Sequence, residues 1–255
     1  MSLLVCESLC VYFGGLKAVD KVSFSVEEGE IFSIIGPNGA GKTTIFNALT
    51  GFLSPTAGRA IFMGKDILGS KPHQIAAHGL TRTYQHTSVF QHLSVLDNAL
   101  IGFHGNQTTT ALDSIFHTKR WKMNEDTATQ QAFEVLDFLG LSDHANTIAS
   151  NLVHGQLRLL EIAIALCAKP KLLLLDEPAT GMNPEEALKL MNLIYKIRDL
   201  GITIMLVEHN MRVVMGISDR VLAIQFGTAL ALGSPNEVAN DKGVIEAYLG
   251  GGYAC

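Results

Sequence analysis

The chain has 255 residues, of which 47% are hydrophobic and 17% are charged, enough to bury a substantial core in one large domain or two intimate subdomains. This apolar content and the lack of a long polar tract argue against intrinsic disorder. A net charge of −5 and a pI near 6.0 argue against a basic face that grips a polyanion, and so against nucleic acid as the main partner.

The first elements expected from the N-terminus are strands. The opening MSLLVCESLC has no basic n-region, so no signal peptide is expected. Val22, Phe24 and Val26 alternate with serines, which is typical of a half-buried strand. The turn EEGE then leads into IFSII (31–35), a short apolar run that indicates a buried central strand.

A phosphate-binding loop follows this buried strand. GPNGAGKT, from Gly36 to Thr43, has the pattern G-x-x-x-x-G-K-[ST] and precedes the helical pattern TIFNAL. Its glycines allow backbone N–H groups to turn inward around phosphate oxygens, and the helix N-terminus adds a positive dipole. Lys42 supplies a charge at the β- and γ-phosphates, and the Thr43 hydroxyl can ligate Mg²⁺. The sequence therefore predicts a site for the phosphates of a nucleotide.

The middle of the chain, from His86 to about Ala168, indicates helices, and strand patterns are scarce there. ATQQAFEVLDFLGL (128–141) is an example, whereas the polar segment GNQTTT (105–110) is typical of an exposed loop. A helical piece is therefore expected between two halves of another fold.

The second half of that fold returns to buried strands. KLLLL (171–175) and ITIMLV (202–207) are apolar runs, and between them apolar residues recur at helical spacing after Pro184. Strand, helix and strand in this order predict an α/β fold with a parallel sheet. No apolar run reaches the roughly 18 residues of a membrane span. Cys6, Cys10, Cys167 and Cys255 form no C-x-x-C pair, which favours a reduced cytosolic compartment.

Three polar side chains follow these later strands. Asp176 and Glu177 end the run LLLLDEP, where the first acid is suited to the Mg²⁺ side and the second to polarising an attacking water. His209 comes two residues after the next strand. His209, and Gln85 in TRTYQHTSVF, are candidate site residues only in combination with the other motifs.

Taken together, these motifs resemble the ATP-binding cassette (ABC) family, in the family's order and over nearly the whole chain. The resemblance implies an α/β fold with a RecA-like P-loop NTPase core, an antiparallel β portion and an inserted helical subdomain. It implies one nucleotide-binding domain over 1–253, with a core over 1–85 and 169–235, a helical subdomain over 86–168 and a C-terminal helix over 236–250.

The resemblance also implies the site, with ATP and Mg²⁺ as cofactors. Catalytic roles fall to Glu177, His209 and Lys42, and metal binding to Thr43, Gln85 and Asp176. The nucleotide would be bound by Phe13 under the adenine, by Gln85, and by the loop residues Gly36, Pro37, Asn38, Gly39, Ala40, Gly41, Lys42, Thr43 and Thr44. The segment Leu152, Val153, His154, Gly155 and Gln156 stands at the signature, which covers the ATP of a partner subunit.

The signature departs from the usual Leu-Ser-Gly-Gly-Gln at Val153 and His154. A hydroxyl that donates to a charged phosphate contributes roughly 1.5–3 kcal/mol, which corresponds to roughly one to two decades in closure, while the Gly155 N–H and the following helix N-terminus remain as donors. Two interpretations stay open: tolerated drift, or a weakened opposite site in a heterodimer. Asn183 also replaces the Asp that commonly ends the dimer-contact loop.

Within the family, several segments, among them FGGLKAVDKVSFSV and VIEAYLGG, resemble the ATPase subunit of branched-chain, or hydrophobic, amino acid importers. The resemblance implies a second ABC ATPase subunit, membrane permease subunits and an extracytoplasmic binding protein as partners, at the cytoplasmic face of the cell membrane. A groove for a short permease helix is expected near Gln85 to Phe103, from the family pattern and the apolar residues Val89, Phe90, Leu93 and Leu96. The alternatives are an importer for urea or small amides, a soluble non-transport ABC ATPase, and a nucleotide-gated clamp with little hydrolysis.

Overall fold

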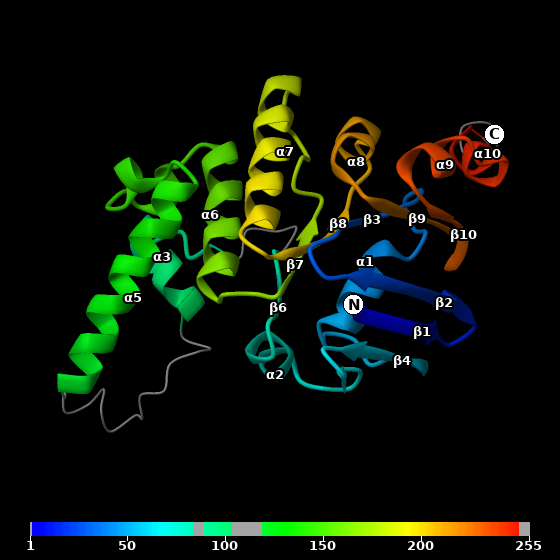
Figure 1. Ribbon diagram of the computed structural model, residues 1–255, viewed down its shortest axis with the longest axis horizontal. Coiled ribbons are helices and arrows are strands. Elements are labelled where there is room, and N and C mark those ends of the chain that lie inside the picture. Colours follow the sequence, from blue (N-terminus) through cyan, green and yellow to red (C-terminus); the bar gives the residue numbers. More distant parts are fainter. Residues whose placement is uncertain (1, 84–88, 104–118, 250–255) are drawn as a thin grey trace. The chain divides into compact units, whose positions relative to one another are not determined.

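The computed structural model describes residues 2–83, 89–103 and 119–249 (Figure 1). The chain divides into two compact units. The first joins Met1–Ile75 to Lys171–Cys255, and the second is Ala76–Pro170. The second unit therefore interrupts the first in sequence.

A largely parallel sheet forms the centre of the first unit. Its strands run in the order β10-β9-β3-β8-β7, with β3 parallel to both β8 and β9, and with β9 and β10 forming an antiparallel hairpin. Every residue of β3, β7 and β8 is buried, which confirms the apolar runs as central strands. The strand bounds are β3 Ile31–Ile35, β7 Leu172–Asp176, β8 Thr203–Val207, β9 Arg220–Gln225 and β10 Thr228–Gly233.

A second, antiparallel sheet has the order β2-β1-β4-β5. Val22, Phe24 and Val26 point into the core and alternate with more exposed serines, as predicted. The ring of Phe24 stacks on that of Phe32 in β3, with centroids 5.4 Å apart, which joins the two sheets. The strand bounds are β1 Ser2–Phe13, β2 Leu16–Glu27, β4 Ala57–Phe62 and β5 Lys65–Asp66.

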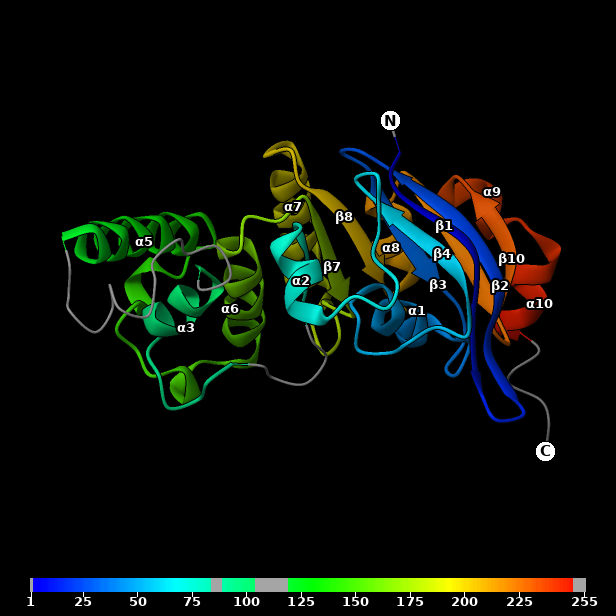
Figure 2. The ribbon, with the colours of Figure 1, turned by 90° about the horizontal axis from the view of Figure 1, so that it is seen from below.

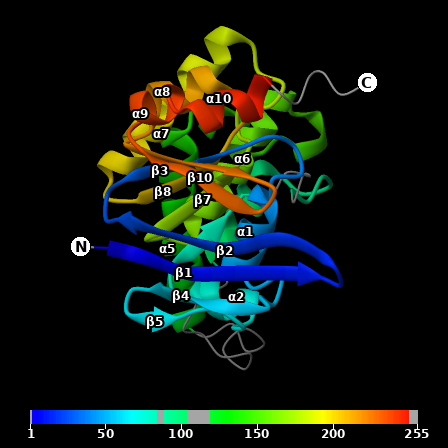
Figure 3. The ribbon, with the colours of Figure 1, turned by 90° about the vertical axis from the view of Figure 1, so that its right-hand side faces the viewer.

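Helices cover the parallel sheet on both faces. In Figures 1 and 3, α7, α8, α9 and α10 lie on one face, while α1 lies on the other, between the two sheets. Where one C-terminal helix was expected over 236–250, the structure has two, because the helix stops at Asn240, whose side chain bonds back to the Asn236 carbonyl at 2.7 Å. The bounds are α1 Lys42–Leu49, α2 Pro72–Ala77, α7 Pro184–Asp199, α8 Met211–Ile217, α9 Pro235–Ala239 and α10 Lys242–Leu249.

The second unit is mainly helical. Its helices α3, α5 and α6 pack on one another (Figure 2). Gly102, at the end of α3, lies so close to α6 that a Cβ there would overlap the carbonyl oxygen of Ile164. The elements are β6 Leu80–Arg82, α3 Val95–Ile101, α5 Lys119–Phe138, α6 His154–Cys167, and the 3-10 turns Ser142–His144 and Ala149–Asn151. The expected loop GNQTTT lies outside the described residues.

Over the part of the chain that the structure describes, no helix has the length and apolarity needed to cross a membrane. Cys6, Cys10 and Cys167 are buried free thiols. Burial raises the pKa of Cys6 and of Cys167 to about 12, so both stay protonated and unreactive near neutral pH.

Candidate functional site

The phosphate loop joins β3 to α1, and two of its glycines are required by their surroundings. Gly36 has a φ of +156°, and a Cβ there would overlap the carbonyl oxygen of Ile224 in β9. Gly41 has a φ of +106°, and a Cβ there would overlap the carbonyl oxygen of Ala18 in β2. Any larger residue at either position would displace the loop.

Lys42 begins α1, and its side chain folds over the loop. Its Nζ donates to the carbonyl oxygens of Gly36 at 2.7 Å and Pro37 at 3.0 Å. Burial lowers the pKa of Lys42, while the negative charges of Glu177 and Asp176 act in the opposite direction. The loop lysine and the two acids therefore share one electrostatic environment, although about 135 residues separate them in the sequence.

The two acids stand where β7 ends. Asp176 is the last residue of the strand and is fully buried. Glu177 has a φ of +48°, a conformation that non-glycine residues rarely adopt, and its N–H donates to the carbonyl oxygen of Val207 at 2.8 Å. This bond to the end of β8 holds the turn that directs the Glu177 side chain out of the strand.

His209 faces Glu177 from the neighbouring strand end. Its Nδ1 lies 3.8 Å from Oε2 of Glu177. The hydroxyl of Thr180 approaches the same oxygen, at 3.4 Å. The side chain of His209 is 53% exposed and that of Glu177 is 17% exposed, so both are accessible to a ligand.

Glu208 is a site residue that sequence reasoning missed. Its side chain is fully buried, and Oε1 accepts the N–H of Ala179 at 2.7 Å. Oε2 accepts the N–H groups of His209 and Asn210, both at 3.0 Å. The signal was present in the sequence, because an acid directly after the buried run ITIMLV requires buried partners.

Tyr248, on α10, is a second residue that sequence reasoning missed. Burial raises the pKa of its hydroxyl, and a hydrogen bond with the Gly36 backbone opposes that rise. On the same helix, Val244 packs in a buried cluster that includes Ile35, the residue before the loop. The last described helix is thus attached to the phosphate loop.

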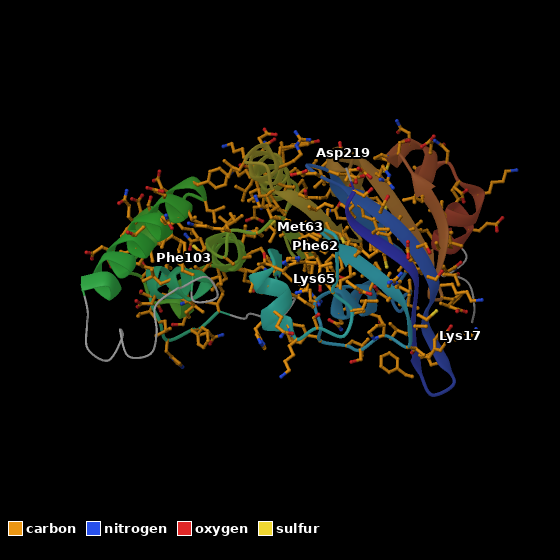
Figure 4. The ribbon with its side chains drawn as sticks, turned by 60° about the horizontal axis from the view of Figure 1, so that its bottom comes forward. Lys17, Phe62, Met63, Lys65, Phe103 and Asp219 are labelled. Atoms are coloured by element: carbon orange, nitrogen blue, oxygen red, sulfur yellow. The ribbon has the colours of Figure 1, made fainter. Side chains whose placement is uncertain are left out.

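The hairpin of β1 and β2 carries Phe13, which is 50% exposed. Lys17, on this hairpin (Figure 4), donates to Oδ2 of Asp20 at 2.8 Å, and the Tyr12 hydroxyl donates to Oδ1 at 2.6 Å. The contact of Ala18 with Gly41 places this hairpin beside the phosphate loop. Phe13 therefore lies on the hairpin that approaches the loop, and half of its side chain is open to solvent.

The signature segment belongs to the second unit. Leu152 is buried, Val153 is 67% exposed, and His154 begins α6. The valine side chain has no acceptor for the first-turn N–H groups of α6, although its backbone N–H donates to Oε1 of Gln156 at 3.2 Å. A Cβ on Gly155 would meet no described atom within 4 Å, so the described chain itself does not require glycine there.

The remaining residues expected at the site and at the subunit contacts differ in their surroundings. Gln85 lies outside the described residues. Val89 is only 6% exposed, which corrects the expectation that it lines an open groove, whereas Phe90 is 56% exposed. The side chain of Asn183 caps α7 by accepting the N–H groups of Glu185 and Glu186, both at 3.0 Å, so this residue has a local structural role.

The side chains suited to Mg²⁺ are those of Thr43, exposed at the start of α1, and Asp176. Their oxygen donors fit this ion, which is commonly held by one or two protein groups together with substrate phosphates. Among the residues that the structure describes, no three His, Cys, Asp or Glu side chains form a metal cluster.

Comparison with known proteins extends this picture. The profile of the family described as ABC transporter matches residues 19–180, and that of branched-chain amino acid ATP-binding cassette transporters matches residues 230–254. The chain is 44% identical to the high-affinity branched-chain amino acid transport ATP-binding protein LivG of Salmonella typhimurium, over 97% of this chain and 98% of that protein. It is 42% identical to the corresponding protein BraF of Pseudomonas aeruginosa, with the same coverage.

Solved structures agree with the sequence relatives. The crystal structure of the ADP conformation of an ATP-binding cassette of an ABC transporter matches with a TM-score of 0.86 and 36% identity, over 98% of this chain and 99% of that one. A nucleotide-free ATP-binding cassette matches with a TM-score of 0.85 and 36% identity, over 97% and 99%. The chain therefore belongs to the ATP-binding cassette family of ABC transporters, as an ATPase subunit.

Proposed function

We propose that ATP is hydrolysed at the site that Lys42, Glu177 and His209 form in the first unit. The observation that carries the proposal is the 3.8 Å approach of His209 Nδ1 to Glu177 Oε2, at a site where the charges of Glu177 and Asp176 oppose the lowering of the Lys42 pKa by burial. The loop N–H groups and Lys42 bind the phosphates, and Phe13 stacks on the adenine.

In this proposal Glu177 accepts the proton of the attacking water, and His209 orients that water and the γ-phosphate. General-base catalysis of this kind contributes about 10²- to 10⁴-fold. Lys42 stabilises the charge that develops on the phosphate oxygens. Thr43, Asp176 and Gln85 would hold Mg²⁺, which, when bound, supplies further positive charge to the phosphates.

The proposed cargo is a branched-chain or other hydrophobic amino acid, moved into the cell. The support is the set of relatives that transport such amino acids and the C-terminal match over residues 230–254. The test is uptake of labelled leucine by cells that carry the complete transporter, with unlabelled isoleucine, valine or urea as competitor. Inhibition by isoleucine and valine supports the proposal, whereas inhibition by urea alone indicates the small-amide alternative.

The proposed partners are a second ABC ATPase subunit, permease subunits and, through the complex, an extracytoplasmic binding protein, at the cytoplasmic face of the membrane. ATP held at the site of one subunit would be covered by the signature segment of the other. Closure by ATP and release by hydrolysis would then drive the permease. The open space at Gly155 supports this arrangement, because it leaves room for a ligand that the partner carries.

The signature provides a prediction. We expect the double substitution Val153→Ser and His154→Gly to raise ATPase of the assembled transporter by less than about threefold. Gly155 and the uncapped first turn of α6 already offer N–H donors, so the added hydroxyl has a limited effect. ATP turnover by the two complexes is the measurement. A rise of tenfold or more would show instead that the natural signature limits the opposite site.

The permease surface provides another prediction. We expect Phe90→Asp to reduce copurification of the permease by at least about tenfold. Phe90 is exposed in this subunit and is proposed to be buried against the permease, where a charge would be unfavourable. The Asn98 side chain fixes the backbone around Phe90 through bonds of 2.8 and 3.0 Å, so the substitution leaves the turn intact. Phe133→Asp, at a 39% exposed position on α5, is the control. Equal copurification of both variants with the permease would show that Phe90 does not lie at the permease contact.

A further inference from the structure

Glu208 occupies the space between two loops that carry proposed catalytic side chains. The first loop follows β7 and contains Glu177 and Ala179, and the second follows β8 and contains His209 and Asn210. Each oxygen of the Glu208 carboxylate faces a different loop: Oε1 accepts from Ala179, and Oε2 accepts from His209 and Asn210. One buried side chain therefore bridges the two loops, in addition to the bond from the Glu177 N–H to the Val207 carbonyl oxygen at 2.8 Å.

The chemistry of these three bonds requires a carboxylate. All three partners are backbone N–H donors, so the group between them must accept at both ends. An amide of the same size can accept at one end only, and its NH₂ group would then face another donor. At this fully buried position the bonds of 2.7, 3.0 and 3.0 Å give both carboxylate oxygens a hydrogen-bond donor.

We propose that Glu208 is a positioning residue that fixes Glu177 relative to His209 for ATP hydrolysis. The proposal rests on the proposed roles of those two residues. The 3.8 Å approach of His209 Nδ1 to Glu177 Oε2 is the geometry that it maintains, because Ala179 lies two residues after Glu177 and the His209 N–H is bonded directly. Displacement of reacting groups by about 1 Å can cost about 10²-fold in rate.

The phosphate loop does not depend on Glu208. Lys42 bonds to loop carbonyls, and the loop glycines contact Ile224 and Ala18, none of which Glu208 touches through a described hydrogen bond. Loss of the carboxylate should therefore slow turnover and leave ATP binding intact. A residue needed only for folding would not separate these two quantities.

The experiment compares Glu208→Gln, Glu30→Gln and Glu177→Gln in the assembled transporter. Glu30 is the matched control, because it is a buried carboxylate that accepts a backbone N–H, from Glu27 at 2.6 Å, and ion-pairs with Arg220 at 3.3 Å. We expect Glu208→Gln to lower kcat about 10- to 100-fold, with the Kd for ATP within about threefold of wild type. Glu30→Gln should keep kcat within about twofold.

Amide hydrogen exchange of the full chain gives a second measurement. We expect faster exchange in Glu208→Gln at Ala179, or at His209 and Asn210, since the amide can serve only one loop. The proposal is overturned if Glu208→Gln keeps kcat within twofold of wild type, if Glu30→Gln lowers kcat equally, or if ATP affinity falls in parallel with kcat. If Glu177→Gln keeps full turnover, the proposed function fails as well. An inactive Glu177→Gln beside an active Glu208→Gln overturns the positioning role alone.

Discussion

Glu177→Gln is expected to reduce ATP turnover of the assembled transporter by at least about 10²-fold while ATP binding persists. The amide has nearly the size of the carboxylate but cannot accept a proton from water, and a general base contributes about 10²- to 10⁴-fold. Binding persists because the phosphates are held by the loop and Lys42. The measurements are steady-state phosphate release and equilibrium binding of labelled ATP.

Glu185→Gln is the matched control for this substitution. Glu185 lies on α7 with its side chain 77% exposed, and it forms a solvent-exposed i,i+4 ion pair with Lys189. Exposed ion pairs of this kind contribute little to stability, so the ATP turnover of Glu185→Gln should equal that of the wild type. If the turnover of Glu177→Gln were within fivefold of that of the control, a group other than Glu177 would be the general base.

Lys42→Ala is expected to weaken ATP binding by roughly 10- to 100-fold. A charged hydrogen bond to phosphate is worth roughly 1.5–3 kcal/mol, and every tenfold change in Kd corresponds to about 1.4 kcal/mol. The fold should survive, because burial already disfavours the Lys42 ammonium and lowers its pKa. The two measurements are the Kd for ATP and the melting temperature of the full chain.

Lys189→Ala serves as the control for Lys42→Ala, since this lysine on α7 is 72% exposed. Its Kd for ATP should not change. An unchanged Kd for Lys42→Ala would contradict the proposed role of the loop lysine. A large fall in melting temperature would show that Lys42 supports the loop rather than the nucleotide.

The central strands could be predicted because their signals are local. IFSII, KLLLL and ITIMLV consist mostly of apolar residues, and the structure buries all of β3, β7 and β8. The start of α7 could also be predicted, since Asn183 and Pro184 form a cap and a first turn. In each case neighbouring residues carry the whole signal.

The supporting contacts of the site could not be predicted, because they join residues far apart in the chain. Nothing near Gly36 indicates that the Ile224 carbonyl excludes a side chain there. Likewise, nothing near Tyr248 indicates a bond to the phosphate loop. Glu208 was visible as an acid after a buried strand, but its partner Ala179 is 29 residues away. Such pairs depend on tertiary packing, which a single sequence does not specify.

The most direct test of the account is ATP-driven uptake of labelled leucine into vesicles that contain the complete transporter. With the wild-type subunit, leucine should accumulate only when ATP is present on the membrane face that carries this subunit. The Glu177→Gln substitution should abolish this accumulation. Accumulation that is equal without ATP, or equal in wild type and Glu177→Gln, would contradict the claim that hydrolysis at this site drives amino acid import.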